Sequence, residues 1–168
     1  MAAWALGRSK DEIPVRKAAD AAPRLRARGV AARYRPMVAL RVAGPSGSRI
    51  LDASLDSGSD DTLLPAYLAG RLGIDLAGAP EGEAKAIGGS PVPYRYARLG
   101  LRLTDGYEEC EWAAIVGFVA APMRWAILGH AGALQFFDVR LLGERREVVL
   151  EPNSLFPGTH TVHRPPPP

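Results

Sequence analysis

The sequence contains one cysteine and three histidines and has no long hydrophobic run. The single cysteine, Cys110, cannot form an internal disulfide bond, so we expect a buried thiol and a reducing, cytoplasmic compartment. The longest uncharged apolar run near the middle of the chain, residues 112–123, is too short to span a bilayer and contains a proline. The first seven residues lack the basic region of a secretory signal peptide. These absences favour a globular protein with no membrane span and no metal cluster.

Charge is small in sum but uneven along the chain. The formal net charge is +3, whereas residues 1–35 carry nine Lys and Arg against three acidic residues. We therefore expect residues 1–33 to be a basic, poorly ordered leader. A basic arm of this kind can bind nucleic acid or an anionic membrane. This one lacks interleaved aromatic residues and phosphate-binding glycines, so no nucleic-acid partner is expected.

Proline is concentrated at the other end of the chain. Residues 153–168 are predicted to be a Pro-rich C-terminal tail, of which residues 160–168 should be extended rather than packed. His160 and His163 lie three residues apart in this tail, which is a weak metal-binding signal, and no metal is expected. Residues 34–152 then remain as a single domain, since 168 residues are too few for two comfortable ones.

Short strands and turns are typical of residues 34–152. Alternating or continuous apolar residues predict strands at 37–42, 51–55, 99–103, 112–119, 125–129, 139–141 and 148–150. Turn residues separate these strands at 44–48, 88–89, 105–106 and 143–144. Short helices are expected after Pro65 and over residues 130–137. The pattern predicts a mainly β fold.

Two well-known site chemistries are disfavoured. No G-x-S-x-G occurs and two of the three histidines lie in the tail, which argues against a serine hydrolase. The run 56–61 begins like a calcium-binding loop, but Asp61 takes the position of its glycine and no glutamate follows before Glu81.

The remaining candidate is the run 52-DASLDSGSDDTLLP-65, which contains four aspartates. Asp56 ends the expected strand, Ser57 can hydrogen-bond neighbouring backbone, and Gly58 allows another segment to approach closely. Most D-S-G triplets are ordinary turns, so the triplet alone is weak evidence.

The run 55-LDSGSDDTLLP-65 resembles the active-site segment of the retroviral-type aspartic proteases, the retropepsins. The run 87-IGG-89 resembles the tip of their flap, and 127-ILGHAGALQFFDV-139 resembles the segment that closes their fold. The three motifs stand in the family's order and cover roughly Arg35 to Pro152. The resemblance implies a closed, β-barrel-like acid-protease lobe with one or two short helices. The composition, rich in Ala, Arg and Gly, is similar to that of bacterial cellular relatives.

By this resemblance Asp56 is the catalytic residue of an aspartic endopeptidase. Pepsin-like enzymes have two such turns in one chain, whereas this chain has only 56-DSG-58. The second carboxylate must then come from another copy, which implies a homodimer. The two Asp56 carboxyls would share a proton and activate a water that hydrolyses the peptide bond of a substrate. No metal or organic cofactor is implied.

The resemblance also implies supporting roles around Asp56. Ser57 matches the hydroxyl that ties the two active-site loops together across the dimer, and Gly58 matches the glycine that faces the substrate. Asp60 matches an aspartate that contacts substrate backbone. We interpret Asp61 as a solvated loop charge and His130 as a surface or helix-start residue.

The flap residues Ile87, Gly88 and Gly89 are expected to cover a bound peptide. A plain hairpin turn is the alternative reading of the two glycines. Pro91 and Pro93 follow directly, and each removes a hydrogen-bond donor, so this strand is expected to be an edge, irregular or stiff.

Two other functions stay open at this point. One is a catalytically inactive dimerisation or peptide-binding module that keeps the retropepsin fold, although the presence of Asp56, Ser57 and Gly58 together argues against it. The other, weaker alternative gives the main role to the basic leader as a nucleic-acid binder.

Overall fold

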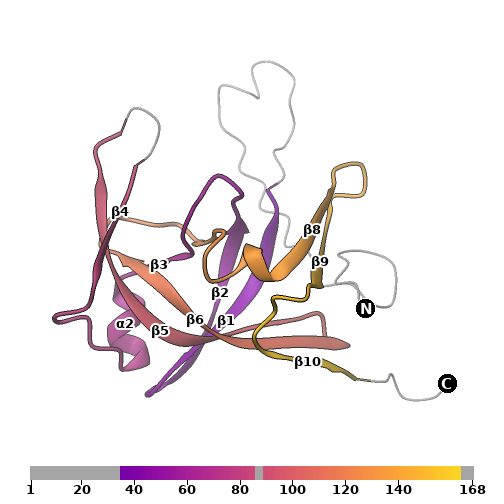
Figure 1. Cartoon of the computed structure of the whole chain (residues 1–168), viewed down its shortest axis with the longest axis horizontal. Helices are drawn as coiled ribbons and strands as arrows, with labels where there is room; N and C mark the ends of the chain where they lie inside the picture. The colour runs from indigo at the N-terminus through magenta and orange to yellow at the C-terminus, as the bar shows by residue number, and fades with distance from the viewer. Residues whose placement is uncertain (1–34, 86–88, 164–168) are drawn as a thin grey trace.

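The computed structural model describes residues 35–85 and 89–163, which are mostly β-strands (Figure 1). The strands are β1 (Met37–Gly44), β2 (Gly47–Leu55), β3 (Leu63–Pro65), β4 (Glu81–Ala84), β5 (Val92–Thr104), β6 (Glu108–Val119), β7 (Ala126–Leu128), β8 (Phe137–Leu142), β9 (Glu147–Pro152) and β10 (Thr159–Val162). The helical segments are α2 (Tyr67–Leu72) and the 3-10 helix η1 (Leu134–Phe136). The prediction of a mainly β fold is confirmed.

Six strands close into a barrel, which is also as expected. Their hydrogen-bonded order is β6-β3-β7-β2-β1-β5, and the long pairing of β5 with β6 closes the ring. Strand β4 pairs with the first residues of β5, and β10 pairs with the first residues of β6. Strands β8 and β9 form a separate hairpin. Most pairs are antiparallel, but β2 with β7 and β3 with β6 run parallel.

Two of the predicted turns join long hairpins. Gly44 pairs with Gly47, so the β1–β2 connection is a two-residue turn. Between β5 and β6, one carboxylate oxygen of Asp105 accepts the backbone N–H groups of Tyr107 and Glu108, both at 2.7 Å. An aspartate that caps its own turn in this way fixes the register of the strands that follow.

The barrel interior is filled by the apolar residues that alternate along the strands. Strands β1 and β5 contribute six side chains that are all at most 4% exposed: Val38, Leu40, Val42, Leu99, Leu101 and Leu103. Burying one such side chain stabilises a fold by about 1.5–3 kcal/mol. Cys110 is also fully buried, so the prediction of a buried thiol is confirmed.

The short helix predicted after Pro65 is present as α2, which begins at Tyr67. Leu68 and Leu72 are buried against the barrel. The carbonyl of Leu72 accepts the Ser46 N–H at 3.0 Å, which docks the end of the helix on the β1–β2 turn.

The helix predicted over residues 130–137 is wrong. Only Leu134–Phe136 form a single 3-10 turn, and Phe137 already begins β8. Gly132 has φ 85°, in the left-handed region, and a residue in this conformation interrupts a right-handed helix.

The prediction that residues 160–168 are not packed is wrong for the residues of this tail that the structure describes. Strand β10 adds to β6, pairing residues 159–162 with 108–111. The Phe156 ring packs against Trp112 and Phe137, with ring centroids 5.8 and 5.4 Å away. The prolines at the end of the chain led to the prediction of an unpacked tail, although Phe156 and the strand-forming residues of β10 precede them.

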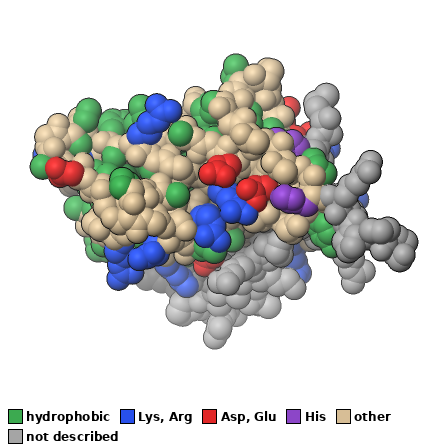
Figure 2. All heavy atoms as spheres, turned by 90° about the horizontal axis from the view of Figure 1, so that it is seen from below, with side chains coloured by type: hydrophobic (Ala, Val, Ile, Leu, Met, Phe, Trp, Pro, Cys, Tyr) green, Lys and Arg blue, Asp and Glu red, His purple; other side chains and the backbone are tan. Residues whose placement is uncertain are grey.

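Figure 2 shows the face on the side of β5, β6 and β10, where acidic side chains lie beside basic and histidine side chains near the centre. Arg102 forms an ion pair with Glu109, and the His160 Nε2 lies 2.9 Å from a carboxylate oxygen of Glu108. Among the residues described, no helix is both long and apolar enough to cross a membrane.

Candidate active site

Asp56 lies at the end of β2, where this strand leaves the barrel wall between β1 and β7. Its backbone N–H donates to the Leu128 carbonyl at 3.1 Å, which extends the pairing of β2 with β7 by one residue. The Asp56 side chain is exposed. The barrel therefore holds the backbone of Asp56 in a fixed place and presents the carboxylate to solvent.

The turn after Asp56 is held by its own hydrogen bonds. One carboxylate oxygen of Asp56 accepts the Gly58 N–H at 3.0 Å, and the Asp56 carbonyl accepts the Ser59 N–H at 3.1 Å. A Cβ atom at Gly58 would lie 3.3 Å from the same carboxylate oxygen, so glycine leaves room for it. Hydrogen bonding to a carboxylate fixes its orientation.

The loop that follows is fastened to the segment after β7. The N–H groups of His130 and Ala131 donate to the carbonyls of Ser59 and Asp60, at 2.9 and 2.7 Å. A Cβ atom at Gly129 would lie 2.2 Å from the Asp61 carbonyl oxygen, a distance that real Cβ atoms do not adopt. Glycine is therefore required where these two segments cross.

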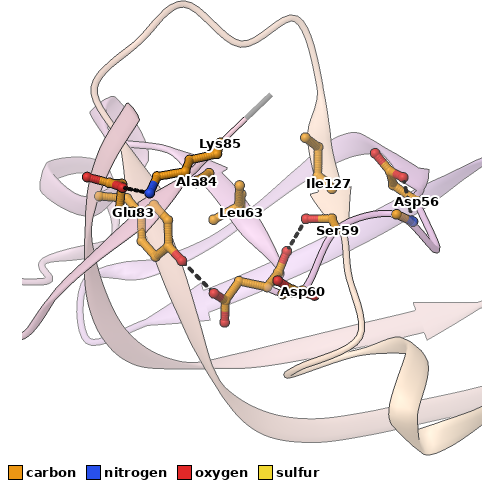
Figure 3. Close-up of a pocket in the computed structure, with 11 residues that line it drawn as sticks. Asp56, Ser59, Asp60, Leu63, Glu83, Ala84, Lys85 and Ile127 are labelled. Atoms are coloured by element: carbon orange, nitrogen blue, oxygen red, sulfur yellow. Dashed lines mark hydrogen bonds and ion pairs between the residues drawn. The ribbon is translucent and has the colours of Figure 1, made fainter. Parts of the chain in front are cut away.

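A pocket of about 470 Å³ opens beside this loop. It lies between the loop after Asp56, strand β4 and the side chains of Tyr94 and Ile127. Figure 3 shows Asp56 at one end of this pocket and the ion pair of Glu83 with Lys85 at the other. The space is an open groove along the loop, with a carboxylate at one end.

Asp61 forms the most connected side-chain cluster of the site. Its Oδ2 atom accepts hydrogen bonds from the hydroxyls of Tyr94, at 2.5 Å, and Tyr96, at 2.9 Å. The interpretation of Asp61 as a solvated loop charge is therefore wrong. The side chain is half-buried because two tyrosines of the neighbouring barrel wall cover it.

The other residues predicted around Asp56 lie either in the pocket or on the exposed turn. Asp60 and Gly58 line the pocket, as does Asp56. Ser57 is exposed at the tip of the turn, and its carbonyl lies 3.2 Å from the Nε2 of His130, which is itself an exposed surface residue, as interpreted.

The predicted flap is described only at its edges. Ile87 and Gly88 lie outside the described residues, and Gly89 is an exposed bend. Pro93 pairs with Glu83 of β4 at the first residues of β5, before β5 begins to pair with β6. The proline therefore stands where the strand has a neighbour on one side only, which agrees with the edge position expected for it.

Several pocket residues were not found from the sequence. Glu83 and Lys85 line the pocket but belong to no motif, and Leu63 lies within the run 55–65 but was assigned no role. Tyr94 and Tyr96 do share a signal, because residues two apart in a strand point to the same face. That spacing alone gave no reason to connect them with an aspartate more than thirty residues earlier.

Within residues 35–85 and 89–163, no group of three or more His, Cys, Asp or Glu side chains is placed to hold a metal ion. Comparison of the chain with protein-family models and with curated proteins gives no match. The geometry of the site therefore carries the argument about function.

Proposed function

We propose that this protein is an aspartic endopeptidase of the retropepsin type that acts as a homodimer. The observation that carries the proposal is the position of Asp56. Its exposed carboxylate stands on a turn fixed by the barrel, at the end of an open groove of about 470 Å³. A fixed carboxylate at the mouth of a groove suits general acid–base chemistry on a bound chain.

One chain provides half of this chemistry. In the proposed dimer two Asp56 carboxyls meet at the two-fold axis, and like charges roughly 3 Å apart cannot both ionise cheaply, as in known aspartic proteases. The pair then shares one proton. One carboxylate removes a proton from a bound water, while its protonated mate polarises the carbonyl of the scissile bond; the roles then exchange to protonate the leaving amine.

The groove suits an extended peptide. Strand β4 ends the sheet order, so one of its edges is unpaired among the described strands, and Glu83, Ala84 and Lys85 at its end line the pocket. An extended peptide can bind such an edge through its own backbone. Asp60, Ile87, Gly88 and Gly89 are proposed to contact this peptide, and Ser57 is proposed to tie the two loops across the dimer.

The exposure of Ser57 and Asp56 supports a contact with a second copy at this end of the barrel. The chain has one cysteine, Cys110, which is buried, and we propose that the protein works in the reducing environment of the cytoplasm. The proposal requires no metal or organic cofactor.

The alternative is a peptide-binding or dimerisation module with the same fold and no chemistry. The unpaired edge of β4 would serve such a module equally well. The two functions differ in what the Asp56 carboxylate does, and a single substitution separates them.

Replacing Asp56 by Asn tests the proposal. Removal of a group that acts as both acid and base is expected to lower cleavage of an unstructured protein at mildly acidic pH by at least about a hundredfold. The substitution keeps the side-chain shape, so the dimer is expected to persist by analytical ultracentrifugation. Asp52→Asn, on the same strand but outside the pocket, is the matched control and should cleave normally.

Equal cleavage by Asp56→Asn and the wild type would overturn the proposal. Peptide binding by both proteins with cleavage by neither would establish the alternative.

A further inference from the structure

The hydroxyls of Tyr94 and Tyr96 converge on one oxygen of Asp61. Both donate to Oδ2, and the two hydroxyl oxygens lie 3.2 Å apart. The two rings meet edge to face, with centroids 5.2 Å apart. In the part of the chain that the structure describes, no Lys or Arg pairs with this carboxylate, so the tyrosines are its charge-stabilising partners.

The Tyr94 ring is packed in one position between neighbouring strands. A Cβ atom at Gly82 of β4 would lie 2.4 Å from the ring, and one at Gly117 of β6 would lie 2.5 Å from it. Glycines on the two strands that flank β5 thus leave the space that the ring fills. With the ring held on both sides, its hydroxyl can point in few directions, and it points at Asp61.

Tyr94 is also kept as a neutral donor. Burial raises its pKa far above the ordinary value, and the hydrogen bond to Asp61 raises it further. The O–H group therefore stays protonated across the working range of most enzymes, and the contact with Asp61 does not depend on pH there.

The cluster adds a side-chain link between the loop and β5. The backbone of residues 59–62 is fastened to residues 130–131, and the Thr62 carbonyl also accepts the Gly117 N–H of β6 at 2.9 Å. The Asp61 side chain fastens the same loop to β5. Ser59 completes the link toward Asp56, since its hydroxyl donates to the Asp61 carbonyl at 2.8 Å and its N–H to the Asp56 carbonyl.

We propose that Tyr94 and Tyr96 are positioning residues that act through Asp61 to hold the loop bearing Asp56 in its reactive place. The effect on catalysis rests on the proposed function, whereas the effect on the loop does not. Small misplacements of a catalytic group lower the rate strongly, so loss of either hydroxyl should lower kcat more than it changes KM.

The test uses Tyr94→Phe and Tyr96→Phe in the full chain, with the exposed Tyr67→Phe as the matched control. Amide hydrogen exchange, resolved by residue, reports on the loop, and hydrolysis of an unstructured protein reports on catalysis. We expect exchange at residues 59–62 to rise about tenfold in each variant, kcat to fall about tenfold, and KM to change less. Exchange in β1 and β2 should stay as in the wild type.

A second set of variants shows whether the tyrosines act through Asp61. In the Asp61→Ala background no side-chain acceptor is left at this position, so Tyr94→Phe should change neither exchange nor kcat further. The same change with and without Asp61, unchanged exchange at residues 59–62, or a rise spread evenly over the barrel would each overturn the inference. If the wild type cleaves nothing, the proposed function fails, and the exchange data still decide whether the tyrosines hold the loop.

Discussion

Gly129 shows how one missing carbon atom lets two segments of the candidate site meet. The Asp61 carbonyl occupies the place where a side chain at residue 129 would begin. Since both segments are also joined by backbone hydrogen bonds, neither can move away without losing them. The loop geometry around Asp56 is thus decided at a residue that carries no chemistry.

Gly129→Ala is therefore expected to destabilise the protein by about 2–4 kcal/mol, measured as the free energy of unfolding in urea. Gly70→Ala is the matched control. A Cβ atom there meets nothing within 4 Å, and Gly70 lies within α2, so the same change should stabilise by about 0.5–1 kcal/mol. Equal effects of the two substitutions would show that the crossing at residue 129 is looser than the distances indicate.

The raised pKa of Tyr94 leads us to predict that the stability of the protein depends on pH above pH 10. Its pKa is raised in the folded protein by burial first and by the bond to Asp61 second, whereas an unfolded tyrosine titrates near pH 10. Above that pH the unfolded chain loses a proton that the folded chain keeps, so stability falls as pH rises, by up to about 1.4 kcal/mol per pH unit. The contribution is fully present below pH 10.

Tyr94→Phe lacks this group. Its deficit in unfolding free energy relative to the wild type should therefore be about 1 kcal/mol smaller at pH 11 than at pH 8. Urea unfolding at both pH values measures this difference. A deficit that is the same at the two pH values would contradict the assignment of a raised pKa to Tyr94.

Among the elements, the added strand β10 matters because it covers an edge of the barrel. The first residues of β6 pair with β5 on one side and with β10 on the other. Without β10, four residues of β6 would present open backbone groups, which invite pairing with other chains. The buried side chain of Glu108 would also lose His160.

Removing residues 159–168 is expected to lower the midpoint of thermal unfolding by about 5 °C, followed by calorimetry, and to promote self-association. Removing only residues 164–168 leaves β10 in place and serves as the control, with an unchanged midpoint. The same midpoint for both truncations would mean that β10 adds no stability.

The elements also show which parts of the structure the sequence could predict. Strands β1, β2, β5 and β6 were predictable because period-two alternation and glycine or aspartate turns are local signals. The segment after β7 and strand β10 were not. Gly132 interrupts the apolar pattern of a helix through its backbone conformation, and β10 gains its partner from a strand about fifty residues earlier. Pairing between strands so far apart in the chain gives no signal in the local sequence.

The candidate site divides in the same way. The turn at Asp56 could be recognised because its chemistry lies in consecutive residues. The contact of Asp61 with Tyr94 and Tyr96 could not, because it requires the β5 wall to come around the barrel and meet the loop. Its charge alone predicted that Asp61 is solvated, but the fold brings two tyrosine hydroxyls onto its carboxylate.

For the molecule as a whole, the closed barrel keeps the backbone at Asp56 fixed while leaving the carboxylate uncovered. The six barrel strands close on themselves, and Asp56 lies at an end of the barrel, where a second copy can meet the site without rearranging it. The proposed dimer would complete each active site with one carboxylate from each chain.

Mixing subunits tests that arrangement directly. When wild-type and Asp56→Asn chains are exchanged in equal amounts, about one quarter of the dimers hold two wild-type chains, so the activity per wild-type chain should fall to about one half. Exchange with Asp52→Asn chains, which keep the carboxylate at position 56, should leave the activity per total chain unchanged. An active site complete within one chain would instead keep its full activity per wild-type chain in the mixture with Asp56→Asn. The ratio measured against increasing Asp56→Asn therefore distinguishes a shared pair of carboxylates from a site that each barrel builds alone.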